Sequence, residues 1–235
     1  MVFAIMEYTK SIAIDGPAGA GKSTVAKRAA AELNFTYVDS GAIYRTCALY
    51  FIEKFGEGAA EAVKNHDLLI KELNSFELDF KISTEVGFGV LLNGTEVGEK
   101  IRTQQVSRFV PVVASLIPVR EKVNAKLQEF SKDHTVLMDG RDIGTCVLPM
   151  SRLKIFLTAS AEIRAERRLK ELFEKGEKAN FEEVLKDVKN RDKMDEERPV
   201  APLKKADDAV LLDTSNMDIN GAVKFIVDYA RQRFI

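Results

Sequence analysis

Tryptophan is missing from this chain, and cysteine and histidine are scarce. The sequence has no Trp, two His, and two Cys at positions 47 and 146. Two cysteines in 235 residues do not make a disulfide framework, and no group of Cys and His has the spacing of a zinc site. We therefore expect two reduced, buried thiols and two histidines at the surface, and neither a redox nor a zinc centre.

Long apolar runs and an excess of charge of one sign are also missing. No run approaches the roughly 20 apolar residues that a membrane-spanning helix needs. Lys and Arg number 35 against 36 Asp and Glu, a formal net charge of -1. Such a chain is not built as a general binder of nucleic acids or anionic membranes, so any anion site must come from local clusters of Arg and Lys. We interpret residues 1–9 as a short leader, with Met6 as an alternative start, and expect a cytoplasmic monomer.

The chain does contain enough apolar material for a full core, since 46% of its residues are hydrophobic. Short apolar runs alternate with helical patterns, which is typical of a parallel sheet covered by helices. The pattern predicts five strands, at residues 11–15, 35–38, 135–138, 153–157 and 209–212. Helices are expected at residues 22–33 and 219–232.

Two segments depart from this alternation. Apolar residues recur at every second position from Phe76 to Ile82, and Asn93-Gly94 follows, the strongest short signal for a hairpin. Residues 75–97 therefore predict a small antiparallel sheet inserted into the fold. Residues 161–202 are strongly charged and helical, with an interruption at Gly176, as expected for a mobile lid.

A complete phosphate-binding motif follows the first predicted strand. The pattern G-x-x-x-x-G-K-[ST] is met by Gly16, Pro17, Ala18, Gly19, Ala20, Gly21, Lys22 and Ser23, with Thr24 next in the helix. Glycines let backbone N–H groups approach phosphate oxygens, the lysine reaches the β- and γ-phosphates, and the hydroxyl binds Mg²⁺. The motif predicts a P-loop NTPase fold that binds ATP, with Lys22 as a catalytic cation and Ser23 as the metal ligand.

Three aspartates at strand ends are candidates to order the Mg²⁺ shell: Asp15, Asp39 and Asp139. The sequence does not choose among them, and each could instead cap a loop or the helix that follows.

Arginines gather where a second anion would bind. Polar clusters that include Arg45 and Arg141 follow the second and third strands, at the edge where open α/β sheets bind ligands. Within residues 161–202, two helical faces carry charge at i, i+3, i+4 and i, i+4, i+7 spacing: Arg164, Arg167 and Arg168, then Arg191, Asp195 and Arg198. Two phosphorylated substrates brought together in a dry site require several fixed cations. The set as a whole favours phosphoryl transfer. Any single arginine can equally be a solvated surface residue or form a salt bridge along its helix, as Arg191 could with Asp195.

Other P-loop functions stay open at this point. A guanine-reading Asn-Lys-x-Asp is excluded, because no Asn in the chain is followed by Lys. A kinase of another small acceptor, such as a different nucleotide or shikimate, and a nucleic-acid-linked ATPase remain alternatives. A nucleotide-sensing module is a third.

The motifs together resemble the bacterial-type cytidylate kinases. They are IAIDGPAGAGKST at residues 12–24, DSGAIYR at 39–45, DGRDIGT at 139–145, the charged segment 191–198 and APL at 201–203, in the same order over residues 11–235. The inserted sheet also resembles an extension found in that bacterial group. The resemblance implies ATP-dependent phosphorylation of CMP and dCMP, with Mg²⁺ and with no nucleic-acid or membrane partner.

The resemblance also implies a site. Lys22, Arg141 and Arg191 would be catalytic, and Arg167 would close over the ATP phosphates. The acceptor would contact Ser40, Tyr44, Arg45, Arg102, Arg120, Arg141, Asp142, Arg191, Asp195 and Arg198. Arg141 and Asp142 would read the cytosine, and Tyr44, Arg45 and Arg120, supported by Arg102, would hold its phosphate. Pro111 stands where some members carry a small hydroxyl residue, so no acceptor contact is carried over there.

The expected architecture is one P-loop kinase domain over residues 1–235: an α/β fold with a five-stranded parallel sheet flanked by helices, an inserted antiparallel sheet and a helical lid. Its parts would be a core (about 10–40, 133–160 and 203–235), an excursion that binds the nucleoside monophosphate (about 41–132) and the lid (about 161–202).

Overall fold

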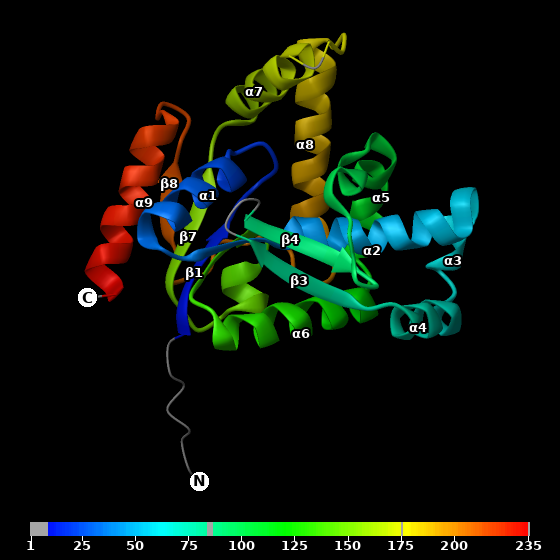
Figure 1. The fold of residues 1–235 in the computed structure, drawn as a ribbon. Coiled ribbons are helices and arrows are strands. Elements are labelled where there is room, and N and C mark those ends of the chain that lie inside the picture. The colour runs from blue at the N-terminus through cyan, green and yellow to red at the C-terminus, as the bar shows by residue number, and fades with distance from the viewer. Residues whose placement is uncertain (1–8, 84–86, 175, 235) are drawn as a thin grey trace. The chain divides into compact units, whose positions relative to one another are not determined.

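The structure is a computed structural model that describes residues 9–83, 87–174 and 176–234. The chain divides into two compact units (Figure 1): Met1–Phe35 with Thr135–Ile235, and Thr36–His134. The leader predicted for residues 1–9 lies outside the described residues apart from Thr9, which begins the first strand.

A parallel sheet forms the centre of the fold. In the described residues its order is β2-β6-β1-β7-β8. The strands are β1 (Thr9–Asp15), β2 (Thr36–Asp39), β6 (Val136–Gly140), β7 (Ser151–Thr158) and β8 (Val210–Asp213). On β1, Ile14 is aligned with Asp139 of β6 and with Ile155 of β7, so the strands end at a common edge. The five-stranded parallel sheet predicted from the sequence is confirmed.

The two central strands are apolar without alternation because both of their faces are covered. In β1, Ile12, Ala13 and Ile14 are fully buried, and so are Leu137 and Met138 in β6. Each large apolar side chain buried in this way stabilises the fold by about 1.5–3 kcal/mol. The core of the first unit therefore holds rigid the strand ends from which the candidate site extends.

Helices of the first unit are α1 (Lys22–Leu33), α7 (Ala161–Glu174), α8 (Phe181–Glu197) and α9 (Ile219–Phe234). Figure 1 shows α1 beside α9, and they contact β6 and β7 respectively. The helix α1 follows Gly21 and ends at Leu33, where Asn34 takes the left-handed conformation that is common at helix C-termini. Helices α7 and α8 pack on each other and confirm the helical character predicted for residues 161–202, with Gly176 between the two helices.

The second unit contains the predicted antiparallel insert. Its strands β3 (Leu78–Ser83), β4 (Gly87–Leu92) and β5 (Thr95–Glu96) pair in that order. Asn93 and Gly94, with φ of 50° and 76°, form the turn between β4 and β5, which only residues tolerant of positive φ make easily. The remaining elements are α2 (Ser40–Phe55), η1 (Gly56–Gly58), α3 (Ala59–Ala62), α4 (His66–Ser75), η2 (Gly98–Arg102), α5 (Gln104–Ala114) and α6 (Ile117–Asp133).

The two cysteines differ in environment. Cys47 on α2 is fully buried, and burial raises the pKa of its thiol to about 12, so it is chemically inert. Cys146 is only partly buried, and the prediction of two buried thiols is wrong for it. It lies in a π-helical turn, η3 (Ile143–Val147), of which Ile143, Gly144 and Val147 are the buried residues.

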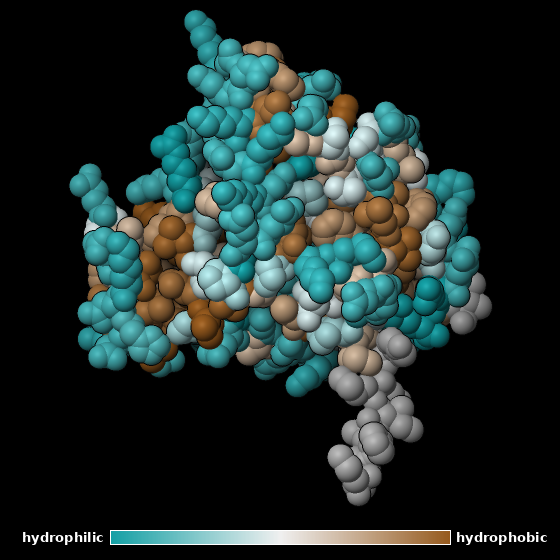
Figure 2. Space-filling model, turned by 180° about the vertical axis from the view of Figure 1, so that it is seen from behind, coloured by the Kyte–Doolittle hydropathy of each residue, from teal (hydrophilic) through white to brown (hydrophobic). Residues whose placement is uncertain are grey.

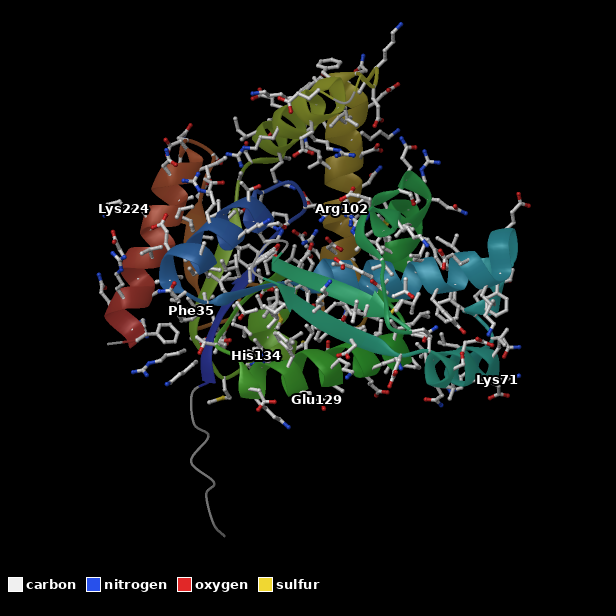
Figure 3. All side chains as sticks on the ribbon, in the orientation of Figure 1. Phe35, Lys71, Arg102, Glu129, His134 and Lys224 are labelled. Atoms are coloured by element: carbon white, nitrogen blue, oxygen red, sulfur yellow. The ribbon has the colours of Figure 1, made fainter. Side chains whose placement is uncertain are left out.

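The two histidines differ in exposure, and the molecular surface is largely polar. His66 is exposed at the start of α4, while His134, labelled in Figure 3, is half-buried and stacks on Phe130. The face drawn in Figure 2 is mostly hydrophilic, with apolar atoms showing between the polar side chains. None of the helices in the described parts of the chain is long and apolar enough to cross a bilayer.

Candidate active site

The phosphate loop runs from the end of β1 into α1, and its first glycine lies against the sheet. Gly16 has φ of 152°, and a Cβ placed on it would come within 1.9 Å of the carbonyl oxygen of Leu157 in β7. No side chain fits at this distance without moving the backbone of a central strand. The glycine is therefore required by packing as well as by approach to a ligand.

We predict that Gly16→Ala lowers the free energy of unfolding by about 2–4 kcal/mol, since the new methyl group must push β1 and β7 apart. Urea unfolding followed by circular dichroism measures the change. Gly58→Ala is the control, because Gly58 has a helical φ of -77° and open space around it. Equal stability of both variants would contradict the close packing.

Three carbonyls of the loop accept hydrogen bonds from side chains. The bonds are Lys22 Nζ to Pro17 O at 2.8 Å, Arg164 Nη1 to Ala18 O at 3.1 Å, and Arg167 Nη1 and Thr214 Oγ1 to Ala20 O at 3.3 and 3.4 Å. The donors come from α1, α7 and the end of β8. These bonds fix the orientation of the peptide units of the loop, whose N–H groups are the donors that an anion cradle requires.

Lys22 is the buried cation of the loop, with 5% of its surface exposed. Burial lowers the pKa of its ammonium group to about 7, and the nearby charge of Arg141 acts in the same direction. Asp139, Asp15 and Asp195 oppose this shift. A buried cation with a strongly shifted pKa and a second cation nearby is typical of a site built to receive a polyanion.

Asp139 is the aspartate that lies beside the predicted metal ligand. Its Oδ2 accepts a hydrogen bond from Ser23 Oγ at 2.9 Å. A hydroxyl and a carboxylate oxygen are donors of the kind that Mg²⁺ prefers, and the ion is usually held by one or two protein groups plus phosphates. The described residues contain no cluster of three or more Asp, Glu, His or Cys that could hold a metal by themselves. The residues present thus fit a nucleotide-bound Mg²⁺.

The other two aspartates have structural partners. Asp15 accepts the backbone N–H groups of Ile143 and Gly144, both at 2.7 Å, and its burial raises its pKa to about 6. Asp39 accepts the N–H of Ala42 at 3.1 Å and caps α2. Geometry therefore distinguishes Asp139 among three aspartates that the sequence left equivalent.

Two ion pairs join the loop after β6 to the end of α8. Arg141 Nε lies 2.8 Å from Asp195 Oδ2, and Arg198 Nη2 lies 3.2 Å from Asp142 Oδ1. Asp195 therefore has a partner on another element, Arg141. The predicted acceptor residues of the first unit are thus brought together, with Arg191 one turn before Asp195 on α8.

Predicted phosphate-binding residues of the second unit form a further group. The Arg120 guanidinium, 3% exposed, lies over the Tyr44 ring at 5.4 Å from its centroid. Arg45 donates to Ser107 Oγ at 2.8 Å. Ser40 is buried at the start of α2. Arg102, labelled in Figure 3, is 63% exposed and lies 3.5 Å from Glu99 along η2, so the structure does not bring it into this group.

Comparison with known proteins decides the family. The family model described as cytidylate kinase matches residues 12–232. The chain belongs to the cytidylate kinase family. Its relatives include the cytidylate kinase of Bacteroides fragilis, 49% identical over 210 residues that cover 89% of this chain and 91% of the relative. The cytidylate kinases of Thermosipho melanesiensis and Shouchella clausii are 44% and 45% identical over 222 and 224 residues, which cover 94% of this chain and 97% and 96% of theirs.

The three arginines of α7 make different contacts in this member of the cytidylate kinase family. Arg164 and Arg167 contact the phosphate loop, whereas Arg168 is exposed and lies 3.1 Å from Glu171 on its own helix. Helical spacing alone placed all three on one face. Arg164 and Arg167 differ from Arg168 because they lie on the side of α7 that contacts the phosphate loop.

Sequence reasoning gave no role to two residues that contact the phosphate loop or one of its anchors. Thr214 follows β8 and bonds the phosphate loop, and Asp192 on α8 pairs with Arg164 at 2.6 Å. The position of Thr214 at the carboxyl end of a parallel strand was a usable signal. No local pattern could have revealed Asp192, because its partner lies on another helix.

Proposed function

We propose that this protein transfers the γ-phosphoryl group of ATP to CMP, and also to dCMP. The observation that carries the proposal is the assembly, in one unit, of a complete phosphate loop with a buried lysine and two Arg–Asp pairs. Most of the chain aligns with proteins named cytidylate kinase, which supports the choice of acceptor.

The two pairs suit cytosine chemically. Cytosine presents an amino group that donates and ring atoms that accept hydrogen bonds. Asp142 would accept from the amino group and Arg141 would donate to the ring edge. Asp195 and Arg198 would lie by the sugar. Uracil, which carries a carbonyl oxygen in place of the amino group, would face a carboxylate with no proton to share.

Acceptor phosphate binding belongs, in this proposal, to Tyr44, Arg45 and Arg120, with Ser40 toward the nucleoside. On the donor side, the N–H groups of residues 16–24 hold the ATP phosphates. Arg167 donates hydrogen bonds to Ala20 O and to Thr214 in this structure. It would exchange these bonds for bonds to phosphate oxygens when the lid formed by residues 161–202 closes.

Transfer would be direct and in line, without a phosphorylated protein intermediate. The acceptor oxygen is already ionised near neutral pH, so the protein needs no strong base. Lys22, Arg141 and Arg191 position the substrates and stabilise the charge of the transferring group. Ser23 and Asp139 would hold Mg²⁺, which neutralises charge on the polyphosphate when it is bound.

The test is ADP release from Mg-ATP with CMP, dCMP, UMP and AMP as acceptors. We expect rapid release with CMP and dCMP and at least about tenfold slower release with AMP, whose purine does not match the Arg141 and Asp142 pair. Release stimulated by RNA or DNA, with no conversion of a pyrimidine monophosphate, would replace the proposal with a nucleic-acid-linked ATPase. Size-exclusion chromatography with the same assay on each fraction tests the predicted monomer, since the activity should elute at the size of one chain.

A further inference from the structure

The guanidinium of Arg164 is held on all sides by protein groups, and only 5% of the residue is exposed. Its Nε donates to Ala159 O at 2.9 Å, and its Nη1 donates to Ala18 O at 3.1 Å. Asp192 accepts from both terminal nitrogens, at 2.8 and 2.6 Å. This forked geometry is the strongest arrangement of an arginine and a carboxylate.

We propose that Arg164 is a positioning residue of the phosphate loop: locked by Asp192, it orients the Ala18–Gly19 peptide for ATP and does not itself bind phosphate. The inference rests on the proposed function, since it concerns the same ATP site. It also changes the expectation from the sequence, where Arg164 belonged to a row of cations facing the substrates.

The planar peptide unit explains how a carbonyl contact acts on the opposite side of the chain. In a trans peptide the C=O and the N–H of the next residue point in opposite directions. With Ala18 O held toward α7, the N–H of Gly19 must point away from α7. The contact with Arg164 therefore fixes the direction in which this N–H is presented, which in our proposal is toward the ATP phosphates.

Glycine makes this control necessary. Gly19 has φ of 74°, and glycine reaches positive and negative φ with similar ease, so the peptide before it has little preference of its own. The loop also packs directly on Arg164, because a Cβ at Gly19 would lie 3.5 Å from Arg164 Cβ. An external hold decides which way the peptide faces.

Arg164 differs from the other two charged anchors of the loop. Lys22 and Arg167 also bond loop carbonyls, but in the proposed function both transfer their donors to the ATP phosphates. Their bonds would then be lost as the nucleotide arrives. Arg164 keeps its bond because its donors are already taken by Asp192 and two carbonyls, so the loop retains this charged anchor through the reaction.

Two variants separate positioning from phosphate binding. In Arg164→Lys, one ammonium group cannot reproduce the fork to Asp192 together with both carbonyl bonds. In Asp192→Asn, the positive charge of Arg164 stays but loses its fixed direction. A positioning role predicts weaker ATP binding in both variants. A phosphate ligand predicts that Asp192→Asn, by releasing the cation from its carboxylate, leaves ATP binding equal or tighter.

The experiment is calorimetric titration with the Mg-bound non-hydrolysable analogue AMP-PNP, together with kcat and both KM values. We expect the Kd for the analogue to rise about tenfold in each variant, with the KM for CMP at saturating ATP within about twofold of the parent. Lys170→Arg is the control and should leave all values unchanged, because Lys170 is exposed on the same helix and lies beside Glu174.

Unchanged or tighter analogue binding in Asp192→Asn would overturn the inference, and so would unchanged binding in Arg164→Lys. Thermal unfolding shows whether each variant is folded, and Asp192→Asn decides the question if Arg164→Lys is not. The proposed function fails separately: a parent protein that binds the analogue but phosphorylates no CMP refutes the acceptor and leaves the loop inference to the binding data.

Discussion

Lys22→Ala is expected to lower kcat by at least about 10³-fold while the protein stays folded. The ammonium group is buried beside the loop and is the donor of the motif that reaches the β- and γ-phosphates. Its charge acts on the transferring group, where a single well-placed donor has its largest effect. Steady-state ADP release with CMP measures the loss.

Stability should change little in this variant, because burial of the ammonium group is itself unfavourable, as the lowering of its pKa to about 7 shows. Lys27→Ala is the control, since Lys27 is an exposed lysine on the same helix. Turnover of Lys22→Ala within about tenfold of the parent would contradict the central role given to this side chain.

Arg141→Ala is expected to reduce kcat/KM for CMP by about 10²–10³-fold, or about 3–4 kcal/mol of transition-state stabilisation. The change removes the donor to cytosine and leaves Asp195, its partner at 2.8 Å, without that counter-charge near the acceptor. Binding of AMP-PNP should stay within about threefold of the parent, because the phosphate loop is intact.

Acceptor kinetics and analogue titration on the same preparation test this second prediction. Arg152→Ala is the matched control: Arg152 belongs to the same unit, and its guanidinium lies over the Phe234 ring at 5.8 Å. A parallel loss of CMP use and nucleotide binding in Arg141→Ala would assign Arg141 to the ATP site instead.

Local signals predicted the elements well because their causes are local. Lys22–Leu33 begins after a glycine and ends before Asn34, and the hairpin at Asn93-Gly94 follows from positive φ at both residues. The strand order β2-β6-β1-β7-β8 could not be predicted from the residues alone, because each central strand is uniformly apolar and could pair with any other.

The pairing of polar side chains likewise could not be predicted from local sequence, although the residues themselves could. The sequence named Arg141, Asp142, Asp195 and Arg198 as site residues but did not pair them, whereas the structure pairs Arg141 with Asp195 and Arg198 with Asp142. Contact between residues far apart in the chain depends on how the elements pack, which helical spacing does not encode. The identities of the acceptor ligands stay predictions that the variants above test.

By itself, the sequence determined the phosphate loop, the alternation that makes an α/β sheet, and the family, because contiguous residues carry these features. Only the tertiary structure decided which aspartate lies beside Ser23 and which arginine of α7 holds the loop. The physical reason is distance: a hydrogen bond needs atoms about 3 Å apart, and folding alone brings Asp139 to Ser23 and Arg164 to Ala18.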